Sequence, residues 1–542
     1  MAGAVFLGLT ATSGRAFGVV GEVAAGWALP DAPEVWSSLD PPATSERAWG
    51  PLVVRATRPM LSVRALGAEA PLAINTYTGG PPDWPARLLT LSTGTPAAGR
   101  VTHALLGLCL LVLAHRFLRF HASFSAAGAA ALILATDWSF VLWRSVLGGT
   151  EVLLAAANLL VIWALWSRRW KGGHHGATAI AFGVGLGLLA KITFAASLAG
   201  VAFAAWISRG DRAPMRPPPP ARPVALVAIV LVCVSPLALA ALLHGTLEAP
   251  IPSHDTLDLQ VRRLIGGWAG AAPAREGLHN LAAFLGDPRA SFAAAYGATA
   301  VSAFSPLRAA GHAITLLGAA LAWRDRVRSP SEALLRFLAL AVPAQIAAIT
   351  LANRDLHHLG PVAVPLALLA ALAADRVAGE LAPPRSVARA ALVAALVSPQ
   401  IVAGVWQLRG TDAVVASIHA PAFTERGQAA LIEALRAHHV RRVVTSDYEL
   451  YGMLEVRAPE IEARHAWGAV ARRAPKKVGP AILRAARGGH YLTVRPTARL
   501  AYNWSPDAGG VTRAATEAGV VVTPVQTLTE GDTVVATLWR VD

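Results

Sequence analysis

The sequence is poor in charged residues, since Asp, Glu, Lys and Arg make up 15% of its 542 residues while hydrophobic residues make up 54%. Ordinary soluble domains carry about 25% charged residues, so this chain has too few charges to coat the surface of a soluble protein. Its apolar residues are gathered into blocks of about 20, the length that crosses a bilayer as a helix. The composition therefore excludes a soluble multidomain enzyme and predicts an α-helical polytopic membrane protein.

Cysteine is almost absent, with only Cys109 and Cys233 in the chain. Both lie inside predicted membrane spans, which excludes a disulfide framework and leaves the redox compartment undetermined. The apolar stretch 2–9 is not followed by a small-residue cleavage site, so we expect the first span itself to act as the insertion signal.

Acidic residues are fewer than basic ones, 33 against 48, and the formal net charge is +15. In a soluble protein this charge would indicate nucleic acid as a partner. Here the basic residues sit in short connections between apolar blocks, the positive-inside pattern of membrane proteins, so we expect no nucleic-acid partner. These connections are residues 116–119, 168–171, 209–222, 324–328 and 376–385.

The apolar blocks predict about eleven membrane-spanning helices. The stretch 176–207 is too long for one span of a hydrocarbon core about 30 Å thick, so we predict two short helices that meet near Lys191. The predicted spans are 2–20, 101–117, 124–143, 149–166, 176–190, 192–207, 223–243, 307–323, 335–352, 359–374 and 386–406.

If the N-terminus is cytoplasmic and successive spans cross the membrane in opposite directions, all the basic connections lie on the cytoplasmic side. The same alternation puts residues 21–100, residues 244–306 and everything after about 407 outside. We therefore predict a multi-pass protein of the inner or plasma membrane whose function is exercised on the external side. Within the second external segment, residues 255–265 have apolar positions at helical spacing and predict a helix on the membrane surface.

The tail, residues 407–542, predicts a small soluble α/β domain outside the membrane, after a transmembrane domain of residues 1–406. It contains no phosphate-binding glycine loop and no metal-ligand spacing, which favours a lid or docking module over an independent catalytic domain. The expected helices are 429–438 and 481–487, and the expected strands are 442–445, 491–494, 520–524 and 534–541.

Basic residues flush with the spans are functional candidates, because charge inside a membrane is costly. Arg354, His357 and His358 follow one span at its external end and could hold a phosphate through charge-assisted hydrogen bonds. The alternative is an ordinary loop with interfacial anchors. Lys191 carries the only charge between residues 176 and 207, and it is a second phosphate-binding candidate unless it simply extends to the membrane interface.

The acidic candidates lie in the first external loop and at the external ends of spans. A carboxylate in such a position can act as general base on a hydroxyl, or as ligand to a divalent ion that neutralises a phosphate. We take Glu22 as the first choice and Asp31 as the second. Further candidates are Asp83, Asp137 and Glu151, each of which has the alternative of a solvated or helix-starting acid.

The order of these parts resembles the GT-C superfamily of membrane glycosyltransferases, which includes protein O-mannosyltransferases and aminoarabinose lipid A transferases. The resemblance is carried by the long external loop after the first span and by segments 71–80, 99–102, 185–191 and 357–365.

The resemblance implies an inverting transferase that moves a sugar from a polyprenyl-phosphate carrier to a lipid, glycan or protein acceptor. Membrane lipids would be further partners, and a divalent metal ion is left open as a cofactor. Glu22 would be the catalytic acid, and Lys191, Arg354, His357 and His358 would lie near the carrier phosphate.

Besides a scaffold whose outer domain recruits partners, two alternatives stay open. Residues 21–100 contain no adjacent pair of acids, whereas members of the superfamily often carry one in this loop, so a degenerate member that binds lipid carriers without transferring sugar is one alternative. A transporter is the other, and it predicts internal repeats with polar residues at the bilayer midplane. The hydropathy blocks show no internal repeat, and the polar residues cluster at the external ends of the spans instead of the midplane.

Overall fold

A computed structural model describes most of the helical part of the chain and much of the tail. The described residues are 1–13, 45–49, 52–57, 60–65, 68–73, 80–93, 96–147, 149–171, 175–208, 223–246, 278, 281–290, 304–324, 327, 329–352, 356–416, 424–445, 450, 453–454, 457–465, 475–494, 508–530 and 533–542.

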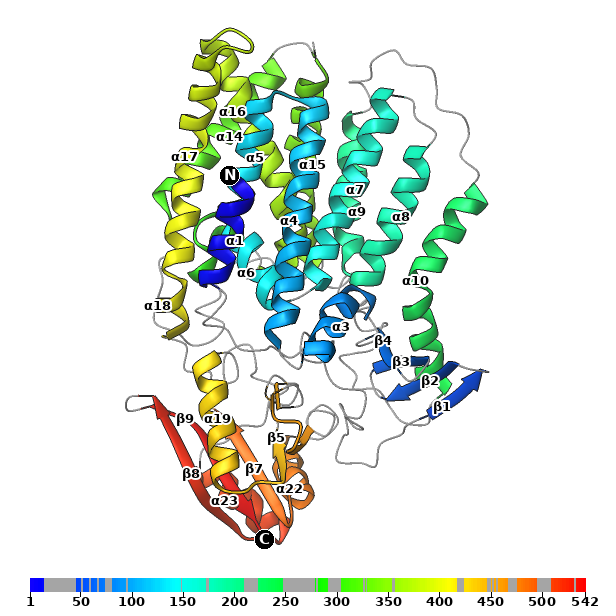
Figure 1. The fold of residues 1–542 in the computed structure, drawn as a ribbon, viewed down its shortest axis with the longest axis vertical. Helices are drawn as coiled ribbons and strands as arrows, with labels where there is room; N and C mark the ends of the chain where they lie inside the picture. Colours follow the sequence, from blue (N-terminus) through cyan, green and yellow to red (C-terminus); the bar gives the residue numbers. More distant parts are fainter. Residues whose placement is uncertain are drawn as a thin grey trace.

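A bundle of apolar helices forms the larger part of the molecule (Figure 1), which confirms the predicted α-helical membrane fold. α16 lies at its centre and is buried on nearly all sides, as expected for a helix that is hydrophobic all round. The helices are α1 (Ala2–Ser13), α4 (Pro96–His121), α5 (Phe124–Thr136), α6 (Trp138–Leu147), α7 (Gly149–Lys171), α8 (His175–Ala190), α9 (Phe194–Ile207), α10 (Pro223–Thr246), α14 (Pro306–Arg324), α15 (Pro330–Ala352), α16 (Ala363–Leu381) and α17 (Val387–Arg409).

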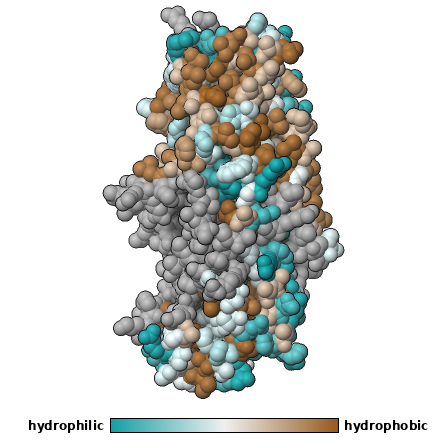
Figure 2. Space-filling model, turned by 90° about the vertical axis from the view of Figure 1, so that its left-hand side faces the viewer, coloured by the Kyte–Doolittle hydropathy of each residue, from teal (hydrophilic) through white to brown (hydrophobic). Residues whose placement is uncertain are grey.

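Every predicted span overlaps at least one of these helices. Among the described residues, five stretches are long and apolar enough to cross a bilayer by length and composition, so the total of eleven stays a prediction. Figure 2 shows the surface over the bundle as mostly hydrophobic, whereas polar residues are frequent on the tail. The five stretches are Ala98–His121, Thr150–Ser167, Pro330–Thr350, Leu359–Leu381 and Val387–Arg409.

The long apolar stretch 176–207 forms two helices, as predicted. α8 ends at Ala190 and α9 begins at Phe194, and the turn between them contains Lys191. The backbone carbonyl of Lys191 accepts a hydrogen bond of 2.9 Å from the amide of Phe194, so the turn itself starts the next helix.

The predicted span 124–143 is not continuous, because the chain breaks at Asp137 between α5 and α6. Asp137 has an extended backbone, with φ −70° and ψ 123°. Its carboxylate accepts a hydrogen bond of 2.8 Å from the amide of Phe140. A short carboxylate in this position caps a new helix, and the hydropathy of the stretch does not reveal the break.

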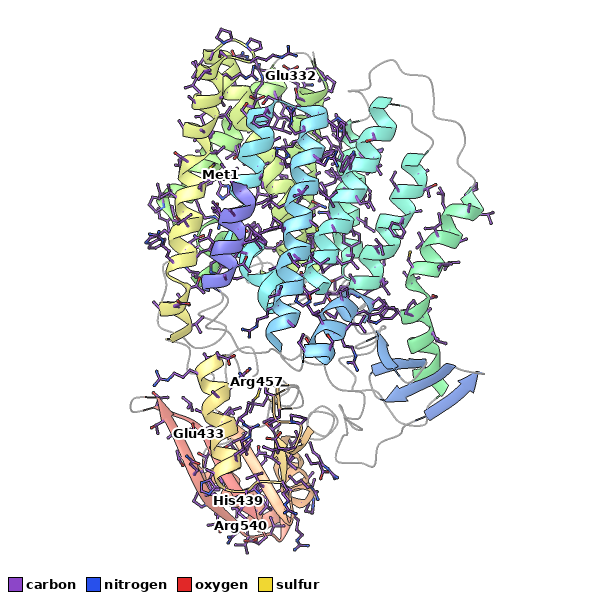
Figure 3. The ribbon with its side chains drawn as sticks, viewed as in Figure 1. Met1, Glu332, Glu433, His439, Arg457 and Arg540 are labelled. Carbon is purple, nitrogen blue, oxygen red and sulfur yellow. The ribbon has the colours of Figure 1, made fainter. Side chains whose placement is uncertain are left out.

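The two ends of the bundle differ. The tail, α3 and a small sheet lie at one end, whereas Glu332, at the start of α15, lies at the opposite end (Figures 1 and 3). This separation agrees with the predicted alternation of external segments and basic connections. Which end faces the outside of the cell remains a prediction.

The first predicted external loop contains a four-stranded antiparallel sheet that the sequence analysis did not predict. Successive strands are joined by only two residues, which is the spacing of tight hairpins, and this spacing is the signal that was missed. The strands are β1 (Ser45–Trp49), β2 (Leu52–Thr57), β3 (Met60–Ala65) and β4 (Ala68–Ala73), followed by the 3-10 helix η1 (Pro81–Asp83) and by α3 (Trp84–Thr93).

The tail contains a five-stranded sheet in the order β6-β5-β7-β9-β8, in which β5 pairs parallel with β6 and β7. All predicted helices and strands of the tail are present, and α18, β6 and α23 were missed. Tyr491, Ile482 and Trp539 lie in its core. The elements are α18 (Thr411–Ala416), α19 (Glu425–Ala437), β5 (Arg442–Thr445), β6 (Glu462–His465), α22 (Pro475–Ala485), β7 (Gly489–Val494), α23 (Ala508–Ala518), β8 (Val522–Glu530) and β9 (Thr533–Val541).

Close packing of α9 on α15 depends on Gly200. A Cβ atom at this position would lie 2.4 Å from the backbone nitrogen of Gln345, which cannot move as a flexible side chain would. We expect Gly200→Val to lower the free energy of unfolding by about 1–3 kcal/mol or more, measured by thermal unfolding in detergent. Gly128→Val is the matched control, because nothing lies within 4 Å of its Cβ position. Equal effects of the two substitutions would contradict the close approach.

His490 makes the stability of the tail depend on pH. Burial lowers the pKa of His490 below its usual 6.5, and the nearby Arg540 and His438 lower it further. The unfolded chain therefore binds a proton at this histidine more readily than the folded chain does. The contribution of neutral His490 to the free energy of unfolding is complete above pH 6.5 and is lost as the pH falls through the lowered pKa. We expect the wild type to lose more thermal stability between pH 7.5 and 5.5 than His490→Gln. An identical loss in both proteins would contradict this assignment.

Candidate functional site

Asp83 is a buried carboxylate at the end of the bundle that carries the tail. Pro81 and Pro82 fix the backbone of η1, and the amide of Asp83 donates to the carbonyl of Gly80 at 3.0 Å. Oδ1 of Asp83 lies 3.3 Å from Nε2 of His103 on α4, and these side chains are 3% and 0% exposed. A carboxylate so deeply buried needs a polar partner, and His103 provides one that the sequence analysis missed.

Glu151 begins α7, the helix against which η1 packs. Its carboxylate is buried and lies in the first turn, where the helix dipole favours negative charge. Asn158 follows seven residues later, two turns further along the same face of the helix. α7 therefore presents a carboxylate at its start and an amide two turns deeper.

Lys191 is also buried, with 2% of its surface exposed. Its neighbours Ala190 and Phe194 pack against Leu154 and Ala157 of α7. Leu154 lies only three residues after Glu151, so the cationic residue and the first turn of α7 occupy the same end of the bundle.

His357 and His358 lie in the 3-10 helix η4 (Leu356–Val362), which packs against α6, α7, α15 and α16. The position of η4 is held by Asn158, whose Nδ2 donates to the carbonyl of Pro361 at 2.9 Å. Both partners come from segments far apart in the sequence, so this bond fixes the late motif against α7.

Asn158 is held in turn by Gln345 of α15, whose Nε2 donates to Oδ1 of Asn158 at 2.8 Å. The same nitrogen donates to the hydroxyl of Ser197 on α9 at 2.7 Å. All three side chains are buried. This polar chain joins α9, α15 and α7 to η4, and it fixes the geometry of the helices that carry Lys191, Glu151 and the two histidines.

α7 is thus the common element of the candidate site. η1 with Asp83, the α8–α9 turn with Lys191, and η4 with His357 and His358 all pack on the helix that begins with Glu151. Three other candidates, Glu22, Asp31 and Arg354, lie outside the described residues. The same holds for the predicted surface helix 255–265.

Asp137 belongs to a different cluster. Its Oδ2 lies 3.1 Å from Nη2 of Arg308 on α14, and Nη1 of Arg308 donates to Oε1 of Gln407 on α17 at 3.0 Å. The backbone carbonyl of Gln407 accepts from Arg289, which itself holds Asp287 through a salt bridge of 2.7 Å. The capping bond and the ion pair engage both oxygens of Asp137, which favours a structural role over the catalytic one we considered.

Metal ligands are not gathered in the described part of the chain. There, no three side chains of His, Cys, Asp or Glu lie close enough together to hold an ion.

No family model and no curated protein matches the chain. Among solved structures, it is similar to ArnT from Cupriavidus metallidurans bound to undecaprenyl phosphate, with 13% identity, a TM-score of 0.54, and coverage of 84% of this chain and 86% of ArnT. It is also similar to the oligosaccharyltransferase AglB from Archaeoglobus fulgidus in complex with an inhibitory peptide and a dolichol-phosphate. That match has 15% identity and a TM-score of 0.42, and it covers 81% of this chain but 60% of AglB. The likeness to ArnT shows that this chain shares the fold of that protein.

Proposed function

We propose that this chain, built on the GT-C fold, is a membrane glycosyltransferase that moves a sugar from a polyprenyl-phosphate donor to a lipid, glycan or protein acceptor. One observation carries the proposal: η1 with Asp83, η4 and the α8–α9 turn with Lys191 all pack on α7, the helix that begins with Glu151. The fold is shared with ArnT, whose structure holds undecaprenyl phosphate, and this supports a carrier of the same chemical type here.

The cationic residues would act on the leaving group. In the proposed reaction an acceptor oxygen attacks the anomeric carbon of the sugar, the bond from that carbon to the phosphate oxygen breaks, and polyprenyl phosphate leaves with the electron pair. Lys191, Arg354, His357 and His358 would stabilise the negative charge that develops on this phosphate. A buried ammonium is effective in this role because charges interact more strongly away from water.

A carboxylate would take the proton of the acceptor hydroxyl as the bond forms. Glu22 and Asp31 remain the proposed bases from the sequence. Asp83 and Glu151 join them as alternatives. The packing of η1 on α7, and the position of Glu151 three residues before Leu154, support this choice. Attack on the face opposite the phosphate would invert the configuration of the sugar.

Amide substitutions of the four acids test this assignment. Glu22→Gln, Asp31→Asn, Asp83→Asn and Glu151→Gln would be compared for transfer of labelled sugar in reconstituted membranes at equal protein level. We expect one of them to lose at least about 100-fold in rate, the size of a general-base contribution, while still binding polyprenyl phosphate. Full activity in all four variants would overturn the role of a carboxylate base.

The degenerate alternative is supported by one specific observation. The first external loop has no adjacent acid pair, so the chain would bind the carrier without breaking the sugar–phosphate bond. In that case the wild type binds polyprenyl-phosphate sugars and leaves them intact, and none of the amide substitutions changes the products.

A further inference from the structure

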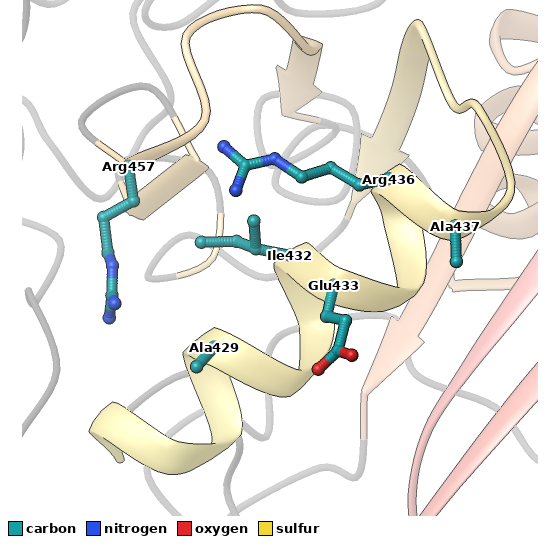
Figure 4. Close-up of a pocket in the computed structure, with 6 residues that line it drawn as sticks. All are labelled: Ala429, Ile432, Glu433, Arg436, Ala437 and Arg457. Carbon is teal, nitrogen blue, oxygen red and sulfur yellow. The ribbon is translucent and has the colours of Figure 1, made fainter.

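A groove of about 430 Å³ lies in the tail, between α19 and the segment that carries Arg457 (Figure 4). Its volume is within the range of sites for small molecules. Figure 4 shows Ile432 and Arg436 pointing from α19 toward Arg457, whereas Glu433 points to another side of the helix. The lining residues are Ala429, Ile432, Glu433, Arg436, Ala437 and Arg457.

α19 is firmly placed, which makes the groove a defined shape. The hydroxyl of Thr424 caps the helix by accepting from the amide of Gly427 at 2.9 Å. On its inner face Leu431 and Leu435 are buried in the core. Ile432 and Arg436 are one turn apart, so an apolar side chain and a guanidinium stand next to each other along the groove.

The guanidinium of Arg457 forms the opposite wall of the groove, and two hydrogen bonds to side chains of α19 fix its orientation. Nη1 donates to Oε1 of Gln428 at 3.0 Å, and Nη2 donates to Oε1 of Glu425 at 2.6 Å. A guanidinium has five N–H donors, so these two bonds leave donors for a ligand. An arginine whose orientation is already fixed loses less entropy when it binds an anion.

Arg436 can bind a ligand with little loss of interaction free energy. It pairs with Glu460 at 2.7 Å, but the side chains are 56% and 50% exposed. Exposed pairs of this kind contribute roughly 0–1 kcal/mol, so an anion in the groove can replace Glu460. Two guanidinium groups from different segments would then hold the anion, with Ile432 beneath the apolar part of the same ligand.

The groove stands next to the membrane bundle. Glu425, which holds Arg457, also lies 3.9 Å from Nη2 of Arg100 on α4. Arg100 is three residues before His103, the partner of Asp83. A ligand in the groove would therefore lie at the end of the bundle where the candidate site is found (Figure 3).

We propose that this groove binds an anionic carbohydrate, with its phosphate or carboxylate between Arg436 and Arg457 and its ring against Ile432. The fork of a guanidinium matches both anions. Ile432, which is 5% exposed, and the exposed Ala429 line the groove and would contact the ring. The proposal concerns binding and stands whether or not the chain transfers sugar. Where it does, the ligand is either the acceptor or an anionic glycan docked beside the site, and the transfer assay below distinguishes the two.

Binding of four probes to the full chain in detergent tests the proposal: glucuronate, glucose 6-phosphate, glucose and inorganic phosphate. Glucuronate and glucose 6-phosphate are compared with glucose by calorimetry, at low and high salt. We expect the two anionic sugars to bind at least about tenfold more tightly than glucose, with an advantage that shrinks in salt. Equal affinity for glucuronate and glucose would overturn the proposal, and so would stronger binding of inorganic phosphate than of glucose 6-phosphate.

Variants assign the binding to the groove. Arg436→Gln and Arg457→Gln are expected to remove most of the preference for anionic sugars, whereas Arg513→Gln, an exposed site on α23, leaves it unchanged. Arg436 is half exposed, so its replacement reports on binding even if Arg457→Gln disturbs the fold. An equal loss in the Arg513 control would overturn the location of the site.

A transfer assay separates the two possible roles of the ligand. Glucuronate that inhibits transfer by the wild type but not by Arg436→Gln identifies the groove as the acceptor site. Binding without inhibition identifies a docking site for an anionic glycan. Because binding is measured without turnover, a failure of the groove proposal and a failure of the proposed transferase are distinguishable.

Discussion

Lys191→Met is expected to lower the rate of sugar transfer by about 100-fold or more while the protein still folds and inserts. The reason is electrostatic: the side chain is 2% exposed at the turn between α8 and α9, where a positive charge acts with little screening on a developing phosphate charge. Removing one preorganised donor to a transition-state oxyanion typically costs about 10²–10³ in rate. Labelled transfer at equal protein level measures the effect.

Two controls accompany this substitution. Lys191→Arg keeps the charge and is expected to retain a larger part of the activity than Lys191→Met. Arg324→Gln removes an exposed positive charge at the other end of the bundle and is expected to leave transfer unchanged. If Lys191→Met transfers sugar at the wild-type rate, the lysine has no part in the reaction and only completes the helix turn.

Arg308→Met is expected to destabilise the protein by about 3–5 kcal/mol, because it leaves the carboxylate of Asp137 without its partner. The pair is mostly buried, with exposures of 7% and 15%, and Gln407 would lose its own hydrogen bond from Arg308. Thermal unfolding in detergent measures the loss. Arg540→Gln, which breaks an exposed pair of 3.0 Å with Asp542, is expected to change stability by less than about 1 kcal/mol.

The double variant Asp137→Asn/Arg308→Met tests the cause. Asparagine keeps an oxygen that can cap α6 at Phe140, but it removes the charge that Arg308 balances. We expect the double variant to recover a large part of the stability lost in Arg308→Met, since no unpaired charge remains buried. A double variant less stable than both single variants combined would show that packing, and not the ion pair, holds α5, α6 and α14 together.

Helix positions were predictable from the sequence because a helix that crosses the lipid must consist mainly of apolar residues, which makes it visible in the hydropathy. The stretch 176–207 exceeds one span, and the division into α8 and α9 at Lys191 followed from length alone. The break at Asp137 did not follow, because it depends on one capping bond and on an arginine 171 residues further along the chain. The β1–β4 sheet was missed because its strands are short and are joined by only two residues.

The candidate site was predictable where charge stands out against an apolar background. Lys191 and Glu151 were proposed by that rule. Glu151 lies in the first turn of α7, and the neighbours of Lys191 pack against Leu154 and Ala157 of the same helix. His103, Asn158 and Gln345 were missed because neutral polar residues within spans resemble the small polar residues that pack helices. Their importance becomes visible only with the bonds they form, such as the one from Asn158 to the carbonyl of Pro361.

The central claim is that the chain breaks the bond between a sugar and a polyprenyl phosphate. The most direct measurement follows the lipid: vesicles containing the purified protein receive a panel of polyprenyl-phosphate sugars together with membrane acceptors, and free polyprenyl phosphate is quantified. We expect its release in equal amount to the sugar that appears on an acceptor, with both lost in Lys191→Met. Movement of the intact donor across the vesicle membrane without release, for every donor in the panel, would contradict the transferase and identify a transporter.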